Sequence, residues 1–475
     1  MLATGQADQA RRARYVGDFV SSVPSLPERC ESIGVALPPG PSAPPTLQTM
    51  RWLFRPIAFM ESCRRRYGDA FSIRFIGFRT PLVMVSDPDA VKAIYAERAN
   101  GLPPGRNATL EPLLGPRSLL LLEGSEHIAR RRLMLPPFHG ERMRSYEAAI
   151  EEIVGAEIDS WPLEREFPIH PRMQAVTLEV ILRVVFGVTE PARLTRLREL
   201  LRRVLHGTAS PALQIFALLA GRIGSQGPMR RFEQLVDEID EELFELIRER
   251  RTDPEVEAHE DILSALVTAR FEDGTAMSDA ELRDQLMTLL LAGHETTATA
   301  LAWTFDLLLR HPAELRRLRA EIGEGGDEYL RATISESLRL RPVIPIAGRR
   351  LASELRVDGY TLPAETDVTP AIWLTHTRPD VYPDPYVFRP ERFLGEGPDT
   401  YAWIPFGGGI RRCLGASFAE FELRIALREV LGRCELRATR PGPELVGRRN
   451  VTFSPRRGTP VLVSERRPAA ETVAA

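Results

Sequence analysis

The chain has 475 residues, of which 43% are hydrophobic, and a formal net charge of −3 at pH 7. This length and hydrophobic content allow one large domain or two or three ordinary ones, with a sizeable buried core. Nucleic acids and anionic membranes usually require a marked excess of basic residues, so the charge argues against a protein that binds either over its whole surface. Any charged docking surface must be local.

Cysteine usage and the apolar runs indicate the compartment. Four cysteines without a Cys-x-x-Cys pair are not typical of a disulfide framework or a zinc ribbon. The N-terminus has no apolar core of signal-peptide length. The most apolar runs, residues 211–221 and 286–293, are shorter than the roughly 18 to 20 residues that span a bilayer. We therefore expect a cytoplasmic protein without a transmembrane segment.

The start of the chain differs from the rest in composition. Residues 1–37 carry mixed charge with scattered proline and glycine, and a proline-rich segment follows at 37–45. We expect a flexible N-terminal segment at 1–37 and a single domain over residues 38–475.

Periodicity then changes along the chain. Residues 70–85 are typical of two short strands, and helical periodicity dominates from about 124 to 341. Short strand-like segments return at 348–368 and 444–463. The pattern predicts a mainly α fold with a smaller β-rich lobe.

One long helix can be placed from its ends. Ser278 followed by Glu281 is a capping-box pattern, and the apolar periodicity continues to about Arg310. Such a helix greatly exceeds the average length of about 11 to 12 residues, so we expect it to cross the interior. Its middle, residues 292–297, reads AGHETT and brings four polar residues into an apolar helix.

The sharpest local signal is FGGGIRRCLG at residues 406–415, a glycine-rich loop that leads into an apolar-periodic helix. A thiolate at Cys413 would gain from the helix N-terminus and from nearby N–H groups, both of which lower a thiol pKa. The four glycines would let the backbone approach a flat cofactor, with Phe406 against its face. The alternatives are an inert buried cysteine or one ligand of a zinc site, but no further Cys or His ligand is nearby.

This loop resembles the haem-binding signature of the cytochrome P-450 superfamily, Phe-x-x-Gly-x-Arg-x-Cys-x-Gly. The matching positions are Phe406, Gly409, Arg411, Cys413 and Gly415. The resemblance implies the fold of that family, with haem b between the long central helix and the cysteine loop, and Cys413 as the iron ligand. It covers most of the chain, because three further motifs follow the family order.

Glu336 and Arg339 form the family's Glu-x-x-Arg pair, which places both charges on one helix face. By itself such a pair is commonly a surface ion pair of about 0 to 1 kcal/mol. The resemblance implies that Arg392, in FRPERF, completes a buried structural triad.

The polar middle of the long helix resembles the family's oxygen-activation motif, with Glu295 as the acid and Thr296 as the alcohol. Gly293 predicts a local opening of the helix that makes room for dioxygen and a water. The alternative is a satisfied buried hydrogen-bond network. A zinc-protease His-Glu-x-x-His helix is excluded by Ala298, and the role of His294 stays open.

The segment GSEHIARR resembles the family's haem-propionate segment, with His127 and Arg131 one helical turn apart. Arg411 and Arg349 are the other propionate ligands that the resemblance implies, with Arg350 as the alternative to Arg349. The implied haem contacts also include Phe406, Gly407, Ala292 and Gly415. One departure is Glu365, where the family usually has glycine in a turn.

The resemblance implies a monooxygenase that hydroxylates or epoxidises a lipophilic small molecule with O₂. No flavin or iron–sulfur motif is present, so electrons must come from a separate ferredoxin or flavodoxin. Arg130, Arg132 and Arg412 are candidates for its basic docking patch. We expect a monomer.

Two rival hypotheses remain at this point. A haem-thiolate peroxygenase, isomerase or dehydratase would not use O₂, and the Glu295 and Thr296 pair argues against it. A haem-based sensor or carrier would keep Cys413 but would not need a proton relay.

Overall fold

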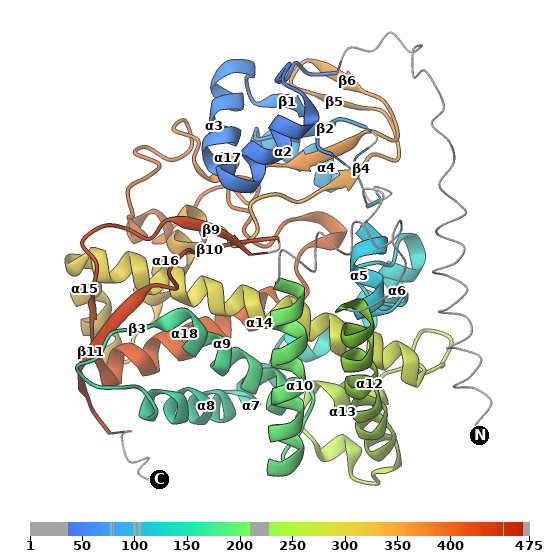
Figure 1. The fold of residues 1–475 in the computed structure, drawn as a ribbon, viewed down its shortest axis with the longest axis vertical. Helices are drawn as coiled ribbons and strands as arrows, with labels where there is room; N and C mark the ends of the chain where they lie inside the picture. Colours follow the sequence, from blue (N-terminus) through green and yellow to red (C-terminus); the bar gives the residue numbers. More distant parts are fainter. Residues whose placement is uncertain are drawn as a thin grey trace.

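The computed structural model describes residues 37–76, 78, 80–97, 101–102, 106–209, 228–449 and 451–468. Apart from residue 37, the expected flexible segment 1–37 lies outside the described residues. The described chain forms a smaller β-rich lobe beside a larger helical lobe (Figure 1), which confirms the prediction of a mainly α fold with a smaller β-rich part.

A four-stranded sheet organises the smaller lobe, in the order β1-β2-β7-β4. Its strands are β1 (Ala70–Ile73), β2 (Leu82–Val85), β7 (Asp367–Pro370) and β4 (Arg349–Arg350). The two strands predicted within residues 70–85 are therefore confirmed, and they pair antiparallel. β2 also pairs in parallel with β7, which joins segments nearly 300 residues apart in the sequence in one lobe. All four residues of β2 are buried, as its apolar sequence LVMV requires.

Short helices and a hairpin complete this lobe. They are α2 (Pro45–Phe54), α3 (Pro56–Tyr67), α4 (Pro88–Ala96), α17 (Ile372–His376), β5 (Leu355–Val357) and β6 (Tyr360–Leu362). The start of α4 shows why the chain turns into a helix here. Asp87 accepts a hydrogen bond from the Ala90 N–H at 2.9 Å, and Pro88 occupies the first helical position, where its missing N–H is harmless.

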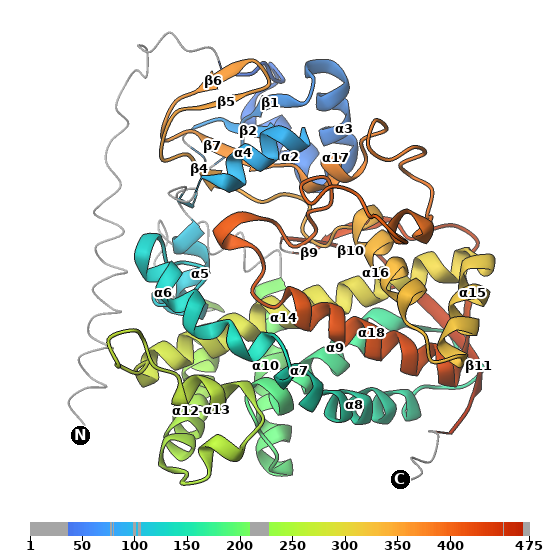
Figure 2. The same ribbon diagram turned by 180° about the vertical axis from the view of Figure 1, so that it is seen from behind.

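The central element of the larger lobe is α14 (Asp279–Arg310), which crosses the middle of the molecule in both ribbon views (Figures 1 and 2). The capping box of Ser278 and Glu281 is present, so the predicted helix is confirmed at both ends. The expected local opening at Gly293 is wrong, because α14 is helical without interruption. A Cβ at Gly293 would lie 3.4 Å from Ile181 Cδ1, so this glycine lies against a neighbouring helical segment.

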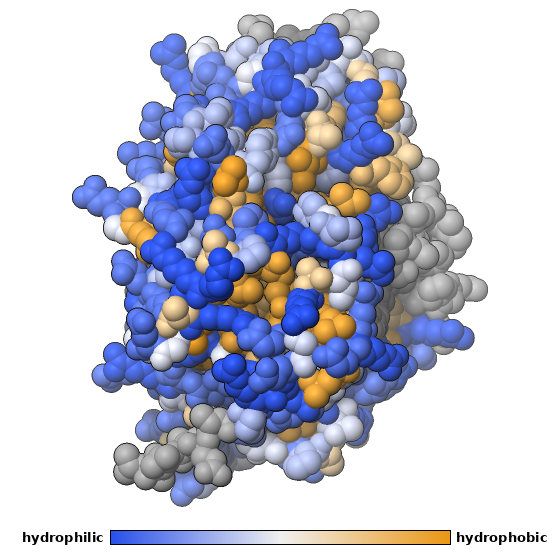
Figure 3. Space-filling model, turned by 90° about the vertical axis from the view of Figure 1, so that its left-hand side faces the viewer, coloured by the Kyte–Doolittle hydropathy of each residue, from blue (hydrophilic) through white to orange (hydrophobic). Residues whose placement is uncertain are grey.

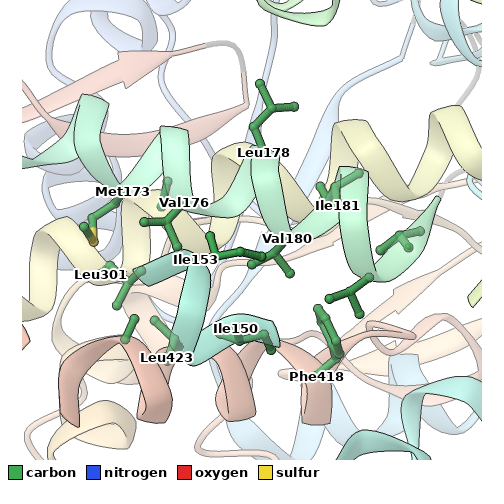
Figure 4. Packing of buried hydrophobic residues seen from close by; sticks show 14 of the residues in the cluster. Ile150, Ile153, Met173, Val176, Leu178, Val180, Ile181, Leu301, Phe418 and Leu423 are labelled. Atoms are coloured by element: carbon green, nitrogen blue, oxygen red, sulfur yellow. The ribbon is translucent and has the colours of Figure 1, made fainter. Parts of the chain in front are cut away.

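Four helices pack around α14 to form the main core: α9 (Ile169–Val180), α12 (Pro228–Thr252), α16 (Glu328–Leu340) and α18 (Ala416–Arg433). α9 continues as a π-helical turn, η2 (Ile181–Val185), of a kind that often occurs near functional sites. α8 (Glu147–Asp159) packs between α9 and α18, where Ile150 and Ile153 meet Val180 and Phe418 (Figure 4).

Further elements complete the described chain. The helices are α5 (Arg106–Leu114), α6 (Gly124–Met134), α7 (Arg142–Ser145), α10 (Pro191–Ala209), α13 (Ile262–Thr268) and α15 (Pro312–Gly323). The 3₁₀ turns are η1 (Pro136–Phe138), η3 (Val256–Ala258), η4 (Pro390–Phe393) and η5 (Gly409–Arg411). A three-stranded sheet has the order β3 (Phe167–Pro168), β11 (Pro460–Arg466), β8 (Cys434–Ala438), and β9 (Val446–Arg449) pairs with β10 (Thr452–Pro455).

Hydrophilic side chains cover most of the face that carries α15 and β11, with hydrophobic side chains gathered near its middle (Figure 3). Within the part of the chain that the structure describes, no helix combines the length and the apolar character needed to cross a bilayer.

Candidate active site

Cys413 lies in a tight loop just before α18. Gly407 and Gly409 have φ angles of 67° and 65°, in the left-handed region that glycine adopts most easily. The loop closes on itself, because the Cys413 N–H donates to the Phe406 carbonyl at 2.9 Å. The backbone thus presents the cysteine at a defined point.

At two positions of the loop, close packing against another segment requires glycine, which the sequence did not indicate. A Cβ at Gly408 would lie 2.3 Å from Tyr95 Cδ2, and one at Gly409 would lie 2.4 Å from the Tyr95 carbonyl oxygen. Both glycines therefore let the loop pack against α4. A Cβ at Gly415 would meet only Phe138 Cδ1, at 3.9 Å, so no such crowding applies there.

The electrostatics of Cys413 differ from the expectation. Desolvation by the surrounding protein raises the thiol pKa and outweighs the hydrogen bond from the Gly415 N–H and the charges of Arg131 and Arg412, which lower it. The expected net lowering of the pKa by this protein environment alone is therefore wrong. The side chain nevertheless keeps accessible surface. Both observations fit a sulfur that faces an enclosed hollow, where a metal cation would favour the thiolate.

One face of α14 also keeps accessible surface inside the molecule. Ala292 is exposed, and Leu289, Gly293 and Thr296 are half-buried, whereas residues 282–288 are all buried. The spacing of these four residues, i, i+3, i+4 and i+7, is that of one helix face. Accessible surface on a central helix indicates a hollow beside it, and this face offers one hydroxyl and no charge.

Four basic side chains from three elements converge near the cysteine loop: His127 and Arg131 of α6, Arg349 of β4 and Arg411 of η5. Burial, together with the charges of Arg411, Arg131 and Arg349, lowers the pKa of His127 to about 4. His127 is buried, and its Nδ1 has no hydrogen-bond partner among the residues that the structure describes. Within the described ranges, neither Arg131 nor Arg349 forms an ion pair with a carboxylate. Two arginines that lie in this cluster without a carboxylate partner among the described residues fit a dianionic ligand.

Arg349 and Arg350 have different environments. The Arg349 guanidinium is buried, lies 5.3 Å from the Tyr95 ring centroid and donates to the Gly348 carbonyl at 2.9 Å. Arg350 donates to the two carboxylate oxygens of Asp367 at 2.8 and 3.1 Å. The ion pair occupies Arg350, so Arg349 is the arginine that belongs to the basic cluster.

Glu295 and Thr296 extend to different partners. The Thr296 hydroxyl donates to the Ala292 carbonyl at 2.5 Å, within the exposed face of α14. A Glu295 carboxylate oxygen accepts from Gln174 of α9 at 2.6 Å, and the other lies 3.8 Å from Arg449 of β9. The acid is thus held by neighbouring elements, whereas the alcohol lies beside the hollow.

The open role of His294 is also clarified by its surroundings. His294 is buried, and its Nδ1 lies 3.0 Å from Thr177 Oγ1 on α9. It contributes to helix packing and does not belong to the accessible face of α14.

Glu336, Arg339 and Arg392 come together as a buried cluster. The Arg339 guanidinium donates to both oxygens of Glu336, at 2.6 and 2.8 Å, and the Arg392 Nε lies 3.5 Å from one of them. Glu336 and Arg339 have no exposed side-chain surface. The cluster joins α16 to η4.

Sequence reasoning missed His376, which connects this cluster to the cysteine loop. Its Nδ1 lies 3.2 Å from the Arg339 carbonyl, and its Nε2 accepts from the Ile404 N–H at 2.8 Å. Ile404 lies two residues before the loop. A single histidine in IWLTHTR carries no local signal for such a role.

The three arginines of the expected docking patch differ in their exposure to solvent. Arg130 is buried, forms an ion pair with Glu281 and lies over the Phe271 ring at 4.9 Å. Its inclusion in a surface patch is therefore wrong. Arg132 is exposed and pairs with Glu272, and Arg412 is exposed.

Comparisons with known proteins agree with this geometry. The family model described as Cytochrome P450 matches residues 38–457. A putative cytochrome P-450 135B1 of Mycobacterium tuberculosis is 42% identical over 447 residues, 92% of this chain and 93% of that protein. A putative cytochrome P-450 137 of the same organism is 40% identical, over 84% of this chain and 83% of that one. The chain belongs to the cytochrome P-450 family.

Solved structures show the same fold. The retinoic acid-bound cyanobacterial CYP120A1 superposes with a TM-score of 0.78 and 26% sequence identity, over 91% of this chain and all of that one. The haem domain of cytochrome P450DA gives a TM-score of 0.79 at 24% identity, over 91% and 98% of the two chains. The predicted fold class is confirmed.

Proteins of this family bind haem b through a cysteine thiolate and are generally monooxygenases. The residues of this chain fit that group. Cys413 keeps accessible surface although the surrounding protein desolvates its thiol, and one uncharged face of α14 keeps accessible surface in the interior. Arg131 and Arg349 lie near His127 and form no ion pair with a carboxylate of the described residues. Haem has the complementary chemistry, because it combines an iron cation and an apolar ring with two propionates.

Proposed function

We propose that this protein is a haem-dependent monooxygenase that inserts one oxygen atom of O₂ into a lipophilic small molecule, by hydroxylation or epoxidation. The convergence of Cys413 with His127, Arg131, Arg349 and Arg411 carries the proposal, because it provides a metal-binding thiol and a cationic rim at one place. Electrons come from a separate ferredoxin or flavodoxin, and Arg132 and Arg412 remain candidates for its docking.

In this proposal Cys413 is the iron ligand and the four basic side chains hold the propionates. The ring would contact Phe406, Gly407, Gly415 and Ala292. The bound haem supplies the redox chemistry that activates dioxygen. Glu336, Arg339 and Arg392 act only structurally, by fixing the core next to the cysteine loop.

Thr296 and Glu295 have separate parts in proton movement. The Thr296 hydroxyl, which rests on the Ala292 carbonyl, can turn its proton into the hollow. Glu295 lies one residue earlier, where Gln174 orients its carboxylate, and restores that proton from the polar side of α14. Proton delivery without bulk water directs the oxygen atom to the substrate and limits its loss as peroxide.

A lipophilic substrate fits the accessible face of α14. Leu289, Ala292 and Gly293 are apolar, and the single hydroxyl of Thr296 is already hydrogen-bonded. An uncharged wall does not compensate the desolvation of a charged metabolite. CYP120A1, which shares the fold, is described with retinoic acid bound, and this also favours a large apolar ligand.

The carbon-monoxide difference spectrum of the reduced protein tests the ligand. We expect the strongly red-shifted Soret band of thiolate ligation, and its loss in Cys413→Ser. A wild-type spectrum of the histidine-ligated type would contradict the assignment of Cys413.

Turnover of a lipophilic panel tests the reaction. We expect product with O₂, a reductase and ferredoxin, and in Thr296→Ala a fall of product per O₂ by about 10²-fold with peroxide in its place. Product formed with peroxide alone, and none with reduced ferredoxin and O₂, would identify a peroxygenase. Identical product yields from the wild type and Thr296→Ala would contradict the role of the hydroxyl.

A further inference from the structure

An unusually apolar surface surrounds α2. This helix has the sequence PTLQTMRWLF, and Gln48 is its only buried residue. Four large hydrophobic side chains of α2 are exposed, namely Leu47, Met50, Leu53 and Phe54. Isolated exposed hydrophobic residues are ordinary, but several on one short helix mark an interaction surface.

The turn between β1 and β2 extends this apolar area. Ile76 and Phe78 lie in the connection between β1 and β2, and the Ile76 N–H donates to the Thr49 hydroxyl of α2 at 3.0 Å. This hydrogen bond holds the turn against the helix.

Trp52 of α2 connects the same area to the β9–β10 hairpin. Its ring centroid lies 5.6 Å from that of Phe75 and 6.4 Å from that of Phe453 in β10. Val451, in the turn of that hairpin, is exposed. Figure 1 shows α2 beside β1 and β2, with the β9–β10 hairpin below them. We name the exposed apolar residues of the three segments the α2 surface: Leu47, Met50, Leu53, Phe54, Ile76, Phe78 and Val451.

The charges on the three segments that form the α2 surface have one sign. Residues 45–54, 71–80 and 446–455 contain no aspartate or glutamate. Arg51, Arg55 and Arg74 are exposed. None of these three arginines forms an ion pair with any residue that the structure describes. The chain as a whole is slightly acidic, so this basic and apolar area is a local feature.

We propose that the α2 surface docks on the surface of an anionic lipid bilayer, with its apolar side chains among the acyl chains and its arginines at the headgroups. The three most exposed side chains, Phe54 at 73%, Val451 at 69% and Ile76 at 58%, stand at the end of a helix and at two separate turns. Protruding tips of this kind insert easily into a deformable layer, whereas a protein partner would need three matching pockets. Insertion of apolar side chains and attraction of arginines to anionic lipids add to each other.

Docking of this kind places the protein where lipophilic molecules accumulate. It does not depend on the proposed reaction, because the surface lies on the β-rich lobe and the turn of the β9–β10 hairpin and uses none of the residues assigned to the haem site. Failure of the docking proposal would leave the monooxygenase proposal unaffected.

Co-sedimentation of the full-length haem protein with vesicles tests the proposal. We expect binding to vesicles of equal parts phosphatidylglycerol and phosphatidylcholine, weaker binding to pure phosphatidylcholine, and weakening by salt. The triple variant Phe54→Ser, Ile76→Ser, Val451→Ser should lower the partition coefficient by at least about tenfold. Arg51→Gln with Arg74→Gln should lower it by roughly fivefold per arginine, on the anionic vesicles only.

The matched control is Leu163→Ser with Val387→Ser, which removes exposed hydrophobic side chains outside the α2 surface. This variant should bind vesicles as the wild type does. All the substituted residues are exposed, and thermal unfolding should confirm that each variant folds. No binding of the wild type, or equal binding of the triple variant, would overturn the proposal. So would a wild-type dimer that the triple variant converts to a monomer in sedimentation velocity, because a second copy would then cover this surface.

Discussion

Glu336 and Arg339 form a fully buried ion pair in which two guanidinium N–H groups donate to the two carboxylate oxygens, at 2.6 and 2.8 Å. Arg339 also donates to the carbonyls of His376 and Pro385, each at 2.8 Å. The pair therefore fastens α16 to the segment that leads towards the cysteine loop.

Removal of one partner should strongly destabilise the protein. Arg339→Ala removes both guanidinium hydrogen bonds from the buried Glu336 carboxylate, which keeps the Arg389 N–H at 2.9 Å and Arg392 at 3.5 Å. We expect a loss of about 3 to 5 kcal/mol in the free energy of unfolding. Urea unfolding measures it. The control is Arg440→Ala, which removes an exposed ion pair with Glu166 and should cost less than about 1 kcal/mol. Similar losses in the two variants would contradict this account.

Adjacent arginines should differ in haem retention. We expect Arg349→Ala to accelerate haem loss to an apo-globin acceptor by about tenfold or more, because a buried cation of the basic cluster is removed. Arg350→Ala should leave the haem-loss rate within about twofold of the wild type and instead lower stability, since Asp367 loses its partner. The opposite order of haem-loss rates would assign the propionate to Arg350.

His376 should make the fold sensitive to acid. Burial and the charge of Arg339 lower its pKa to about 3, below the usual 6.5 that the unfolded chain retains. Below pH 6.5 the unfolded chain binds a proton at this histidine and the folded protein does not. As the pH falls from 6.5 to about 3, the histidine therefore lowers the free energy of unfolding by about 1.4 kcal/mol per pH unit. Other buried histidines add to the slope, so the measurement compares urea unfolding of the wild type and His376→Gln between pH 7.5 and 4.5. Equal slopes would show that His376 does not titrate as expected.

Glu365 should tolerate glycine and reject a β-branched residue. It has a φ of 65°, which explains why related turns favour glycine at this position. In Glu365→Gly, relief of backbone strain offsets the greater flexibility of the unfolded chain and the lost exposed contact with Arg350, so we expect a change under about 1 kcal/mol. Glu365→Val should lose about 1 to 2 kcal/mol. Thermal unfolding distinguishes the two variants, and equal stability of both would contradict backbone strain at position 365.

The sequence by itself determined the features that depend on near neighbours. The capping box of Ser278 and Glu281 needs only residues three apart, and the loop around Cys413 needs glycines that adopt positive φ before a helix. The continuous apolar run of β2 and the helical periodicity of α14 likewise follow from local residue order. These signals predicted the fold class, the position of the long helix and the candidate thiolate.

Only the tertiary structure decided which side chains face one another. Arg349 and Arg350 are adjacent in sequence, yet one joins the basic cluster and the other pairs with Asp367. Arg130 becomes buried against Glu281, and Gly408 meets Tyr95, although both contacts join distant segments. The physical reason is that backbone geometry responds to a few neighbouring residues, whereas burial, desolvation and ion pairing depend on which segments pack together in space.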